Sequence, residues 1–315
     1  MKLLVTGGAG YIGSHVVLEA ERAGHECVVV DNLSTGLESR IDCRLEKIDM
    51  ASSDAAEKLS GLLASEKFDS VIHLAARKQV GESVEMPERY YLENIGGLAN
   101  LLLAMRETGH QSLVFSSSAA TYGMPDTDQV MEDGPTKPIN PYGETKLIGE
   151  WMVRNAARWG LRGVNLRYFN VAGTGQPGLA DTAALNLIPI AIGQLRSGKT
   201  PVIFGTDYPT ADGSCIRDYV HVGDLARAHV MAVDYLERAE RKFDTFNVGT
   251  GSGASVIEVL DELKRVSGSD FKPIIGERRA GDPPRLVANV ERIEKELGFR
   301  AEFGLAEIVE SAWNL

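Results

Sequence analysis

The fold is decided by the stretch Lys2-Leu-Leu-Val-Thr-Gly-Gly-Ala-Gly-Tyr-Ile-Gly-Ser14, an apolar run that stops at a glycine-rich turn. Such a run predicts a buried strand of a parallel sheet. From Ile12 the apolar residues recur at helical spacing until about Gly24, which predicts a helix directly after the turn. Glycines at 7, 10 and 13 permit, in order, a tight turn, the approach of the backbone to a pyrophosphate, and close helix packing. The turn therefore predicts a dinucleotide site at a helix N-terminus, with a plain strand–helix turn as the structural alternative.

A carboxylate stands where the second strand should end. Residues 27–30 predict that strand, and Asp31 closes it. A carboxylate at this place binds the ribose hydroxyls of adenosine and repels an added 2′-phosphate, so Asp31 favours NAD over NADP. The alternative is a helix cap or a turn residue. Asp49 closes a third strand and could bind the adenine amine, although a structural role is almost as strong an interpretation.

The alternation of apolar runs and helical stretches continues along the chain. Strands are predicted at residues 45–48, 71–74, 113–115 and 164–166, and residues 245–248 read as a strand that rejoins the sheet. This predicts an α/β fold, a doubly wound parallel Rossmann sheet with a smaller mixed α/β C-terminal substrate domain. We expect residues 1–170 to form the NAD-binding domain, with part of 215–250 returning to it. Residues 171–315, which contain three long polar loops, are expected to form most of the substrate domain.

Composition and charge narrow the class of protein. With 315 residues, of which 43% are hydrophobic and 24% charged, the chain has the make-up of a globular protein with a full core. A net charge of −11 argues against a nucleic-acid partner but allows an anionic small ligand in a local cationic pocket. No apolar run approaches the roughly 18 residues of a membrane span. Residues 1–5 lead straight into the glycine turn and leave no room for a signal peptide.

The cysteines and histidines point to no disulfide and no metal. Cys27, Cys43 and Cys215 are odd in number and widely spaced, which predicts free thiols in a reducing cytoplasm. The six histidines form no H-x-H or H-E-x-x-H pattern, so the sequence predicts no metal centre.

Tyr142 and Lys146, one helical turn apart, carry the strongest sign of chemistry. A tyrosine has a pKa near 10, so it acts as a base at neutral pH only where positive charge lowers that pKa. A lysine ammonium on the same helix face, together with a positive nicotinamide ring, can supply that charge in a desolvated cleft. Serines 116–118 follow a strand directly and so lie at the carboxyl edge of the sheet, where one could hydrogen-bond the reacting hydroxyl. The alternatives are a tyrosine packed beside a surface lysine and a serine turn.

Together, the glycine turn, Ser118 and Tyr142-x-x-x-Lys146 resemble the short-chain dehydrogenase/reductase superfamily in its extended, sugar-nucleotide-modifying form. Longer segments resemble the UDP-glucose 4-epimerase (UDP-galactose 4-epimerase) family, from the first strand to Gly298-Phe299. Two of these segments are the most specific to that family, Ile203-Phe-Gly-Thr-Asp-Tyr-Pro-Thr210 and Arg217-Asp-Tyr-Val-His-Val222. The others are Thr6-Gly-Gly-Ala-Gly-Tyr-Ile-Gly-Ser-His15, Asp31-Asn-Leu-Ser34, Lys78-Gln-Val-Gly-Glu-Ser83, Asn140-Pro-Tyr-Gly-Glu-Thr-Lys146 and Arg167-Tyr-Phe-Asn170.

The resemblance implies an NAD-dependent isomerase that interconverts UDP-glucose and UDP-galactose. In that reaction Tyr142 removes the proton of the 4′-hydroxyl, and Ser118 hydrogen-bonds the same oxygen. Lys146 holds the nicotinamide ribose and lowers the tyrosine pKa. The C4 hydride passes to tightly held NAD, the 4-keto sugar swings over in the pocket, and the hydride returns to its other face, so NAD is not consumed.

The resemblance also assigns binding residues. The predicted cofactor site comprises Gly7, Gly10, Tyr11, Ile12, Gly13, Asp31, Asn32, Asp49, Met50, Leu74, Ala75, Ala76, Lys78, Asn94, Ser116, Tyr142, Lys146 and Tyr168. The predicted substrate site comprises Lys78, Ser118, Tyr142, Asn170, Asn186, Leu187, Val202, Phe204, Arg217, Tyr219, Arg279, Asp282 and Leu286. Arg217 and Arg279 can each offer forked donors to a pyrophosphate, although either arginine alone reads equally well as half of a surface ion pair.

Leu286 leaves the sugar open. In the family, a large aromatic residue at this position tends to exclude N-acetylated sugars and a smaller one tends to admit them. Leucine is intermediate, so UDP-N-acetylhexosamines are a further expected substrate class, and a UDP-N-acetylglucosamine or UDP-glucuronate 4-epimerase is the alternative enzyme. A non-catalytic NAD-sensing protein is a weaker alternative, because Ser118, Tyr142 and Lys146 are all present. Residues 118–120 lack the Asp-Glu pair of related 4,6-dehydratases, which sets dehydration aside.

Two apolar helices predict self-association. Residues 98–105 and the helix from Pro141 to about Trp159 carry apolar side chains on more than one face, although Tyr142 and Lys146 must face the site. We therefore expect a homodimer, as the resemblance also implies. Burial of both helices against the chain's own sheet is the alternative.

Overall fold

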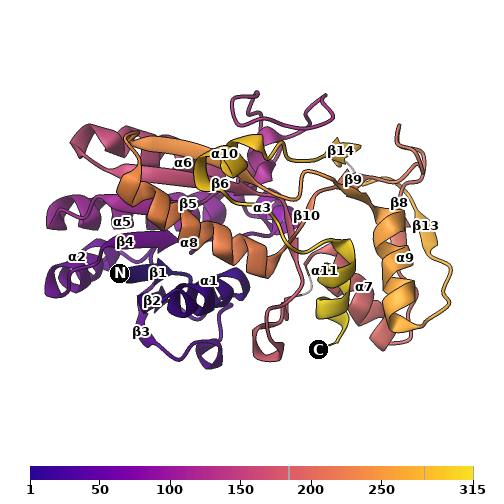
Figure 1. Ribbon diagram of the computed structural model, residues 1–315, viewed down its shortest axis with the longest axis horizontal. Coiled ribbons are helices and arrows are strands. Elements are labelled where there is room, and N and C mark those ends of the chain that lie inside the picture. The colour runs from indigo at the N-terminus through magenta and orange to yellow at the C-terminus, as the bar shows by residue number, and fades with distance from the viewer. Residues whose placement is uncertain (184, 280, 315) are drawn as a thin grey trace. The chain divides into compact units, whose positions relative to one another are not determined.

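The computed structural model describes residues 1–183, 185–279 and 281–314, which divide into two compact units. The first unit contains residues 1–121, 138–167 and 226–246, and the second contains residues 122–137, 168–225 and 247–315. Residues 184, 280 and 315, which the predicted second domain includes, lie outside the described residues. Figure 1 shows the chain coloured from the N-terminus to the C-terminus, with many of its helices and strands labelled.

The first unit is built on a seven-stranded sheet with the strand order β11-β6-β5-β4-β1-β2-β3. Strands β1 to β6 pair in parallel with their neighbours, which confirms the predicted parallel sheet. Strand β11 lies beside β6, which confirms that residues 245–248 rejoin the sheet. The sheet grows from β1 to β3 and then from β1 to β4 on the other side, which makes a switch point at the carboxyl ends of β1 and β4. The strands are β1 (Lys2–Thr6), β2 (Glu26–Asp31), β3 (Arg44–Lys47), β4 (Ser70–His73), β5 (Ser112–Ser116), β6 (Arg162–Tyr168) and β11 (Phe243–Val248).

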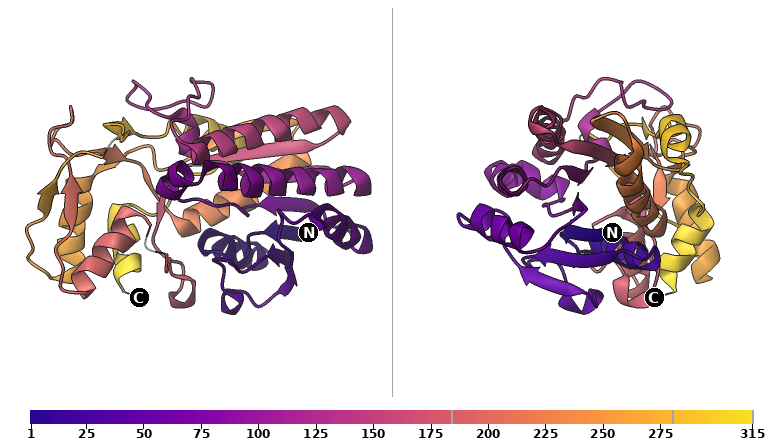
Figure 2. Two further views of the ribbon diagram at one scale, coloured as in Figure 1. Left: turned by 180° about the vertical axis from the view of Figure 1, so that it is seen from behind. Right: turned by 60° about the vertical axis from the view of Figure 1, so that its left-hand side comes forward.

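Helices cover both faces of this sheet, with α2, α5 and α6 on one face and α1 and α8 on the other (Figures 1 and 2). The core lies where leucines of α2 and α5 meet the strands, and Leu59, Leu101 and Leu113 are fully buried there. Asn140 caps α6 by accepting a hydrogen bond from the Gly143 N–H group (2.8 Å), which fixes where that helix begins. The longer helices are α1 (Tyr11–Arg22), α2 (Ala55–Ser65), α5 (Gly96–Thr108), α6 (Pro141–Ala156) and α8 (Val222–Arg238).

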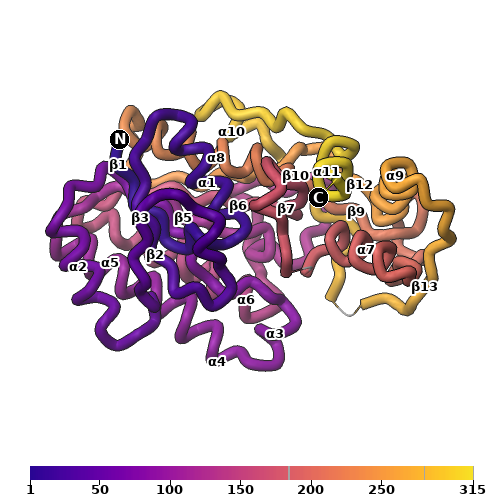
Figure 3. The backbone as a smooth tube through the Cα atoms, turned by 90° about the horizontal axis from the view of Figure 1, so that it is seen from below, coloured from indigo at the N-terminus to yellow at the C-terminus, as the bar shows by residue number. Residues whose placement is uncertain are grey.

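Short helical segments connect these elements. Three of them, α3, α4 and η2, precede α5 and contact α6, and Figure 3 shows α3 and α4 near α6. The segment η2 is a π-helical turn, a form often found at functional sites. The short segments are α3 (Val80–Glu85), α4 (Pro87–Tyr90), η1 (Glu38–Arg40), η2 (Tyr91–Ile95), η3 (Ala119–Tyr122) and η4 (Ala157–Trp159).

The second unit mixes short strands with helices. Its core lies where α7, α9 and α11 meet, with Ile188, Leu260 and Ile308 buried. β10 pairs with β7 and β13 with β8 in parallel, and β9 lies between β12 and β14. The elements are β7 (Asn170–Ala172), η5 (Pro177–Leu179), α7 (Leu187–Arg196), β8 (Val202–Phe204), β9 (Ile216–Arg217), β10 (Tyr219–His221), β12 (Ala254–Ser255), α9 (Val256–Ser267), β13 (Ile274–Gly276), β14 (Arg285–Leu286), α10 (Glu291–Leu297) and α11 (Leu305–Trp313).

Residues 122–137 belong to the second unit, whereas the sequence analysis runs the first domain unbroken to residue 170. Val130 forms a β-bridge with Ala288, and the Tyr122 hydroxyl donates a hydrogen bond to the Asn247 side-chain oxygen (2.6 Å). The second pair is separated by 125 residues in the chain. Such contacts have no local signature in the sequence, so the excursion could not be predicted from residue patterns.

Candidate active site

The glycine turn depends on the absence of side chains. Gly7 has a φ of 75°, and a Cβ there would lie 2.6 Å from the Ala75 nitrogen. A Cβ on Gly13 would lie 2.1 Å from the Gly7 carbonyl oxygen, so α1 packs against the turn too closely for any other residue. Gly10 immediately precedes α1, and Tyr11 begins it. The turn is a cradle of the kind that accepts a pyrophosphate at a helix N-terminus.

Asp31, the last residue of β2, braces this turn. Its carboxylate accepts hydrogen bonds from the N–H groups of Ala9 (3.1 Å) and Leu33 (2.8 Å). Burial raises the pKa of the Asp31 carboxyl group, and these backbone hydrogen bonds oppose the rise. Asp31 therefore has a turn role, and it stands at the strand end where the sequence expects a ribose-binding carboxylate.

The neighbouring adenosine candidates differ in exposure. Asp49 is exposed and accepts a hydrogen bond from the Ala51 N–H group (3.0 Å), an Asx turn of the structural kind. Met50 beside it is buried. Asn32 is exposed, and its side-chain oxygen accepts a hydrogen bond from the Ser34 N–H group (3.0 Å).

Asn94, on the π-helical turn η2, is buried and ties three segments together. It accepts a hydrogen bond from the Arg77 N–H group (2.7 Å) and donates one to the Arg77 carbonyl oxygen (3.1 Å). It also donates to the Thr145 hydroxyl on α6 (3.0 Å). Asn94 thus fixes the loop that follows β4 against α6, which contains Tyr142 and Lys146.

That loop also contains the predicted cofactor residues 74–78. The N–H groups of Leu74 and Ala75 both donate to the Thr6 carbonyl oxygen, at 2.9 and 3.1 Å. Ala76 and Lys78 are exposed, and the Lys78 ammonium nitrogen lies 5.7 Å from the centroid of the Tyr11 ring. The loop therefore starts at the glycine turn and presents a cation beside α1.

The three predicted catalytic residues, Ser118, Tyr142 and Lys146, are buried together in the first unit. Ser118 follows β5, and hydrogen bonding by its side chain acts to lower the pKa of the Tyr142 phenol. The Lys146 ammonium donates to the Ser116 carbonyl oxygen (2.8 Å), and its nitrogen lies 5.9 Å from the centroid of the Tyr142 ring. A phenol, a hydroxyl and an amine at one edge of a parallel sheet form a set suited to moving a proton to or from an alcohol.

Burial acts on the two titratable members of this set in opposite directions. It raises the pKa of the Tyr142 phenol, and the hydrogen bond with Ser118 opposes the rise. It lowers the pKa of the Lys146 ammonium to about 7. The expected lowering of the Tyr142 pKa by Lys146 and a positive nicotinamide ring concerns the protein with its cofactor bound, and it stays a prediction.

The serine segment has further buried partners that the sequence analysis missed. The Ser116 hydroxyl is 2.7 Å from the His229 ring on α8, and the Ser117 hydroxyl donates to the Glu150 carboxylate on α6 (2.5 Å). Glu150 also accepts two hydrogen bonds from the Arg167 guanidinium, at 2.8 and 2.6 Å. The spacing of Glu150, eight residues after Tyr142 on one helix, is a signal that could have identified it.

In the second unit, the predicted phosphate-binding arginines lie against partners from distant segments. The Arg217 guanidinium donates to the Ile216 carbonyl oxygen (2.9 Å) and the Pro283 carbonyl oxygen (2.7 Å), and it lies 3.3 Å from the Asp282 carboxylate. The Arg279 guanidinium carbon lies 3.9 Å above the centroid of the Phe204 ring. Both arginines are therefore oriented by neighbours, and Phe204 and Asp282 belong to the same group of residues.

Asp218 organises these segments, and the sequence analysis did not select it. It is fully buried, and its carboxylate accepts hydrogen bonds from the Thr250 N–H and hydroxyl groups (2.7 and 2.8 Å), the Gly251 N–H group (2.9 Å) and the Ala288 N–H group (3.1 Å). Burial raises the pKa of this carboxyl group, against the pull of those bonds. Asp218 thereby fixes the two residues beside it, the predicted substrate residues Arg217 and Tyr219.

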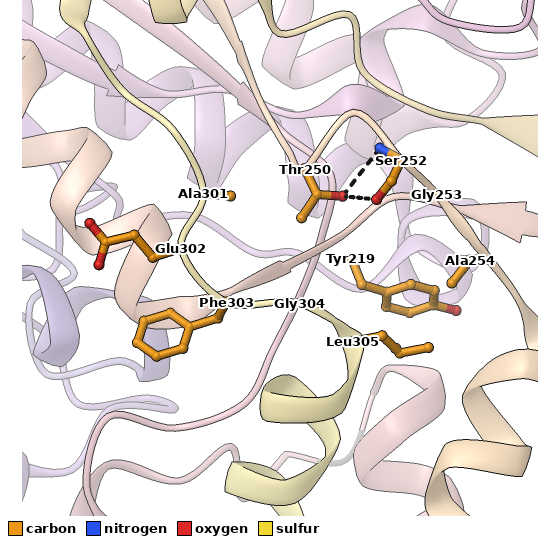
Figure 4. Close-up of a pocket in the computed structure, with 10 residues that line it drawn as sticks. All are labelled: Tyr219, Thr250, Ser252, Gly253, Ala254, Ala301, Glu302, Phe303, Gly304 and Leu305. Atoms are coloured by element: carbon orange, nitrogen blue, oxygen red, sulfur yellow. Dashed lines mark hydrogen bonds between the residues drawn. The ribbon is translucent and has the colours of Figure 1, made fainter.

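A cavity of about 220 Å³ opens in the second unit beside Tyr219 (Figure 4). It is lined by Tyr219, by residues 250 and 252–254, and by residues 301–305. Two of the remaining substrate candidates form hydrogen bonds: the Asn170 N–H group donates to the Asp218 carbonyl oxygen, and the Asn186 side chain donates to the Val171 carbonyl oxygen (3.4 Å). Leu187 begins α7, Val202 begins β8, and Leu286 of β14 pairs with Arg217 of β9. Tyr168, the last residue of β6, belongs to the second unit.

The described ranges contain no group of three His, Cys, Asp or Glu side chains arranged to hold a metal ion. None of the helices in the described part of the chain is both long enough and apolar enough to span a bilayer. Cys27, Cys43 and Cys215 are free thiols.

Comparison with known proteins agrees with this geometry. A sequence model described as the NAD dependent epimerase/dehydratase family matches residues 3–249. The chain is 42% identical to a UDP-glucose 4-epimerase of Corynebacterium glutamicum, over 99% of this chain and 95% of that protein. A solved UDP-glucose-4-epimerase from Stenotrophomonas maltophila, with bound NAD and formylated UDP-arabinopyranose, is similar with a TM-score of 0.94 and 36% identity, over 100% of this chain and 97% of that chain. The UDP-Glc/GlcNAc 4-epimerase of Campylobacter jejuni gives a TM-score of 0.88 and 39% identity, over 99% and 98% of the two chains.

Proposed function

Because the chain belongs to the NAD dependent epimerase/dehydratase family, we propose that it interconverts UDP-glucose and UDP-galactose by reversible oxidation at C4 through a 4-keto sugar. It is an NAD-dependent isomerase. The proposal rests on the similarity to UDP-glucose 4-epimerases over nearly the whole chain. It also rests on the burial of Ser118, Tyr142 and Lys146 in the unit that contains the glycine turn.

The residues of the first unit fit NAD. The side-chain-free cradle at Gly7 and Gly13 suits the pyrophosphate, and Asp31 stands where a ribose would need an acceptor. NAD, when bound, supplies the reversible hydride acceptor that oxidation of a sugar alcohol requires. We assign cofactor binding to this unit and most of the UDP-sugar binding to the second unit.

In the proposed reaction, Tyr142 takes the proton of the 4′-hydroxyl and later returns it. Ser118 holds the same oxygen by a hydrogen bond and stabilises the phenolate form of Tyr142. Lys146 contributes positive charge when protonated and binds the nicotinamide ribose. Burial raises the pKa of the Tyr142 phenol. The hydrogen bond from Ser118, the charge of Lys146 and the positive ring of the cofactor must therefore act together for Tyr142 to serve as a base.

In the second unit, Arg217 and Arg279 are the donors proposed for the pyrophosphate. Asp282 and Pro283 orient the first, and the Phe204 ring supports the second. A guanidinium held in this way offers two parallel donors to a phosphate at a small cost in side-chain entropy. The net charge of −11 makes such a local concentration of cations necessary for a doubly negative ligand.

Leu286 supports a second substrate class. It is half-buried in β14 and pairs with Arg217, so it lies next to the proposed pyrophosphate donors. A leucine leaves more space than a tyrosine would, and the similar Campylobacter jejuni enzyme is a UDP-Glc/GlcNAc 4-epimerase. We therefore propose additional activity on UDP-N-acetylhexosamines.

We also propose a homodimer and a place in the cytoplasm. Leu92 of η2, Leu103 of α5 and Trp151 of α6 are large apolar side chains on helices that contact one another, and they are exposed by 70%, 57% and 46%. Covering them with a second copy would bury this apolar surface. A monomer mass by light scattering at micromolar concentration would contradict the dimer.

The proposal of a cytoplasmic location rests on the cysteines, because three free thiols fit a reducing compartment.

The test is to mix the purified protein with UDP-galactose, without added NAD, and to separate the nucleotide sugars by chromatography. We expect UDP-glucose to form, because a retained cofactor is regenerated in each cycle. Tyr142→Phe is the matched variant and should retain NAD while losing turnover. If UDP-glucose does not form even with added NAD, the UDP-hexose reaction is refuted and UDP-N-acetylglucosamine and UDP-glucuronate become the substrates to try.

A further inference from the structure

The serine segment 116–118 is tied to one face of α6 at three successive points. Tyr142, Lys146 and Glu150 are four residues apart along that helix, so their side chains project from nearly the same face. Lys146 donates a hydrogen bond to the carbonyl oxygen of the first serine, and Glu150 accepts one from the hydroxyl of the middle serine. The side chain of the last serine acts on Tyr142 by lowering the pKa of its phenol. Two of these three helix residues belong to the proposed reaction, and the third has no role in it.

Glu150 is held rigidly from the opposite side by Arg167 of β6. The guanidinium makes two hydrogen bonds to the two carboxylate oxygens, and the side chains of Arg167 and Glu150 are only 7% and 5% exposed. Such a fork fixes the plane of the carboxylate. Because β6 is the neighbour of β5 in the sheet, the pair also fixes α6 relative to the strand from which the serines emerge.

A buried ion pair is weak evidence for stability, because apolar residues of similar size often stabilise a fold as well or better. The Glu150–Arg167 pair is better explained by the position that it gives to the serine segment. Ser117 is fully buried, and its hydroxyl meets the fixed carboxylate at 2.5 Å. The next residue is Ser118, so a rotation of the segment about Ser117 would move the Ser118 hydroxyl away from Tyr142. Misplacement of a reacting group by about 1 Å can cost about a hundredfold in rate.

We propose that Glu150, clamped by Arg167, is a positioning residue of this active site: through the Ser117 hydroxyl it holds Ser118 against Tyr142. The catalytic meaning of this inference rests on the proposed function, whereas the placement of Ser118 does not. Glu150 touches neither substrate nor cofactor in this role and acts through the serine segment alone.

Ser117→Ala is the most direct test, because it removes the link and leaves the Glu150–Arg167 pair intact. We expect kcat with UDP-galactose to fall by about tenfold or more, while KM changes by less than about twofold. The rise of kcat with pH should shift to higher pH, since a misplaced Ser118 stabilises the Tyr142 phenolate less. Ser112→Ala is the matched control: it removes a hydroxyl from the other end of β5, where Ser112 meets Ser70 (2.9 Å), and should change none of these quantities.

A second measurement does not depend on turnover. The phenol of Tyr142 is titrated by near-ultraviolet absorption in NAD-saturated protein, as the difference between each protein and its Tyr142→Phe counterpart. Ser117→Ala should raise the Tyr142 pKa, and Ser112→Ala should leave it unchanged. An unchanged pKa in Ser117→Ala, or wild-type kcat and pH dependence, would overturn the inference. If the wild-type protein fails to convert UDP-galactose but the titration shifts, the positioning role stands and the proposed function fails.

Glu150→Asp gives a graded check on the clamp itself. It keeps the negative charge that Arg167 needs but withdraws the carboxylate by one methylene from Ser117. We expect a loss of kcat similar to that of Ser117→Ala, with NAD content unchanged. Full activity in a folded Glu150→Asp protein would contradict the proposal, because the serine hydroxyl would then have no need of that carboxylate.

Discussion

Lys146 gives a prediction whose size follows from the structure. Burial lowers the pKa of its ammonium group from the ordinary 10.5 to about 7. Between these two pH values the unfolded chain carries a proton on Lys146 and the folded chain does not, so stability rises with pH. The difference of 10.5 − 7 = 3.5 pH units, at about 1.4 kcal/mol per unit, corresponds to about 5 kcal/mol. That stability is absent below pH 7 and is recovered as the pH approaches 10.

The perturbation is Lys146→Met, which removes the titration and keeps an unbranched side chain. We expect the free energy of unfolding of the wild type, minus that of the variant, to be constant below about pH 7 and to rise by about 1.4 kcal/mol per pH unit from pH 7 to 10. The variant also loses the hydrogen bond to the Ser116 carbonyl oxygen. Since that oxygen does not titrate, its loss offsets the whole curve and leaves the slope unchanged.

The assay is urea unfolding at several pH values, followed by tryptophan fluorescence. Trp151 and Trp159 lie in the first unit with Lys146, and Trp313 lies in the second unit. Both proteins therefore carry Trp313→Phe, so that the signal reports the unit that contains Lys146. Lys58→Met, which removes a half-exposed lysine of α2, shows the general effect of losing one lysine. A difference curve that stays flat from pH 7 to 10, or that falls, would refute the argument that burial disfavours the ammonium form.

Three further substitutions test other parts of the site. Gly13→Ala should abolish NAD retention, because the new Cβ would lie 2.1 Å from a backbone oxygen. The absorbance of the purified protein measures this, and the control Gly61→Ala in α2, whose Cβ would have nothing within 4 Å, should retain NAD. Asp218→Asn should raise the KM for UDP-galactose by about tenfold or more at unchanged NAD content. The reason is that an amide cannot accept all four hydrogen bonds that the carboxylate accepts. An unchanged KM would contradict the proposal that Asp218 holds these segments in place. Leu286→Tyr should reduce turnover of UDP-N-acetylglucosamine by about tenfold more than turnover of UDP-galactose, and an equal loss on both would show that this position does not read the N-acetyl group.

The parts of the fold that the sequence predicts correctly are those with local causes. A parallel strand buried on both faces needs a continuous apolar run, and each run predicted in the first domain lies on a strand of the sheet within about two residues at either end. The glycine turn was equally readable, because the close approach at Gly13 excludes every other residue at that position. The return of residues 245–248 to the sheet followed from the same pattern.

What the sequence did not predict has long-range causes. Nothing in the local sequence around Asp218 shows that residues 250, 251 and 288 converge on its carboxylate. Arg167 and Glu150 are 17 residues apart, and their pairing depends on the packing of α6 over β6. Of these residues, Glu150 has a local signal in the sequence, its helical spacing from Tyr142 and Lys146.

The burial of Tyr142 and Lys146 adds an effect on their pKa values that the spacing of the two residues does not show. The pattern predicts that the lysine and a bound nicotinamide ring together stabilise the phenolate, and the packing that brings Tyr142 and Lys146 together also removes water from both groups. Desolvation favours the neutral form of each, raising the phenol pKa and lowering that of the ammonium to about 7, so near neutral pH the lysine itself loses part of the charge it was expected to lend. Three sources of help remain for Tyr142: the hydroxyl of Ser118, the protonated fraction of Lys146, and the positive ring of a bound cofactor. The first acts only at hydrogen-bonding distance, so the position of the serine segment bears directly on the pKa of Tyr142.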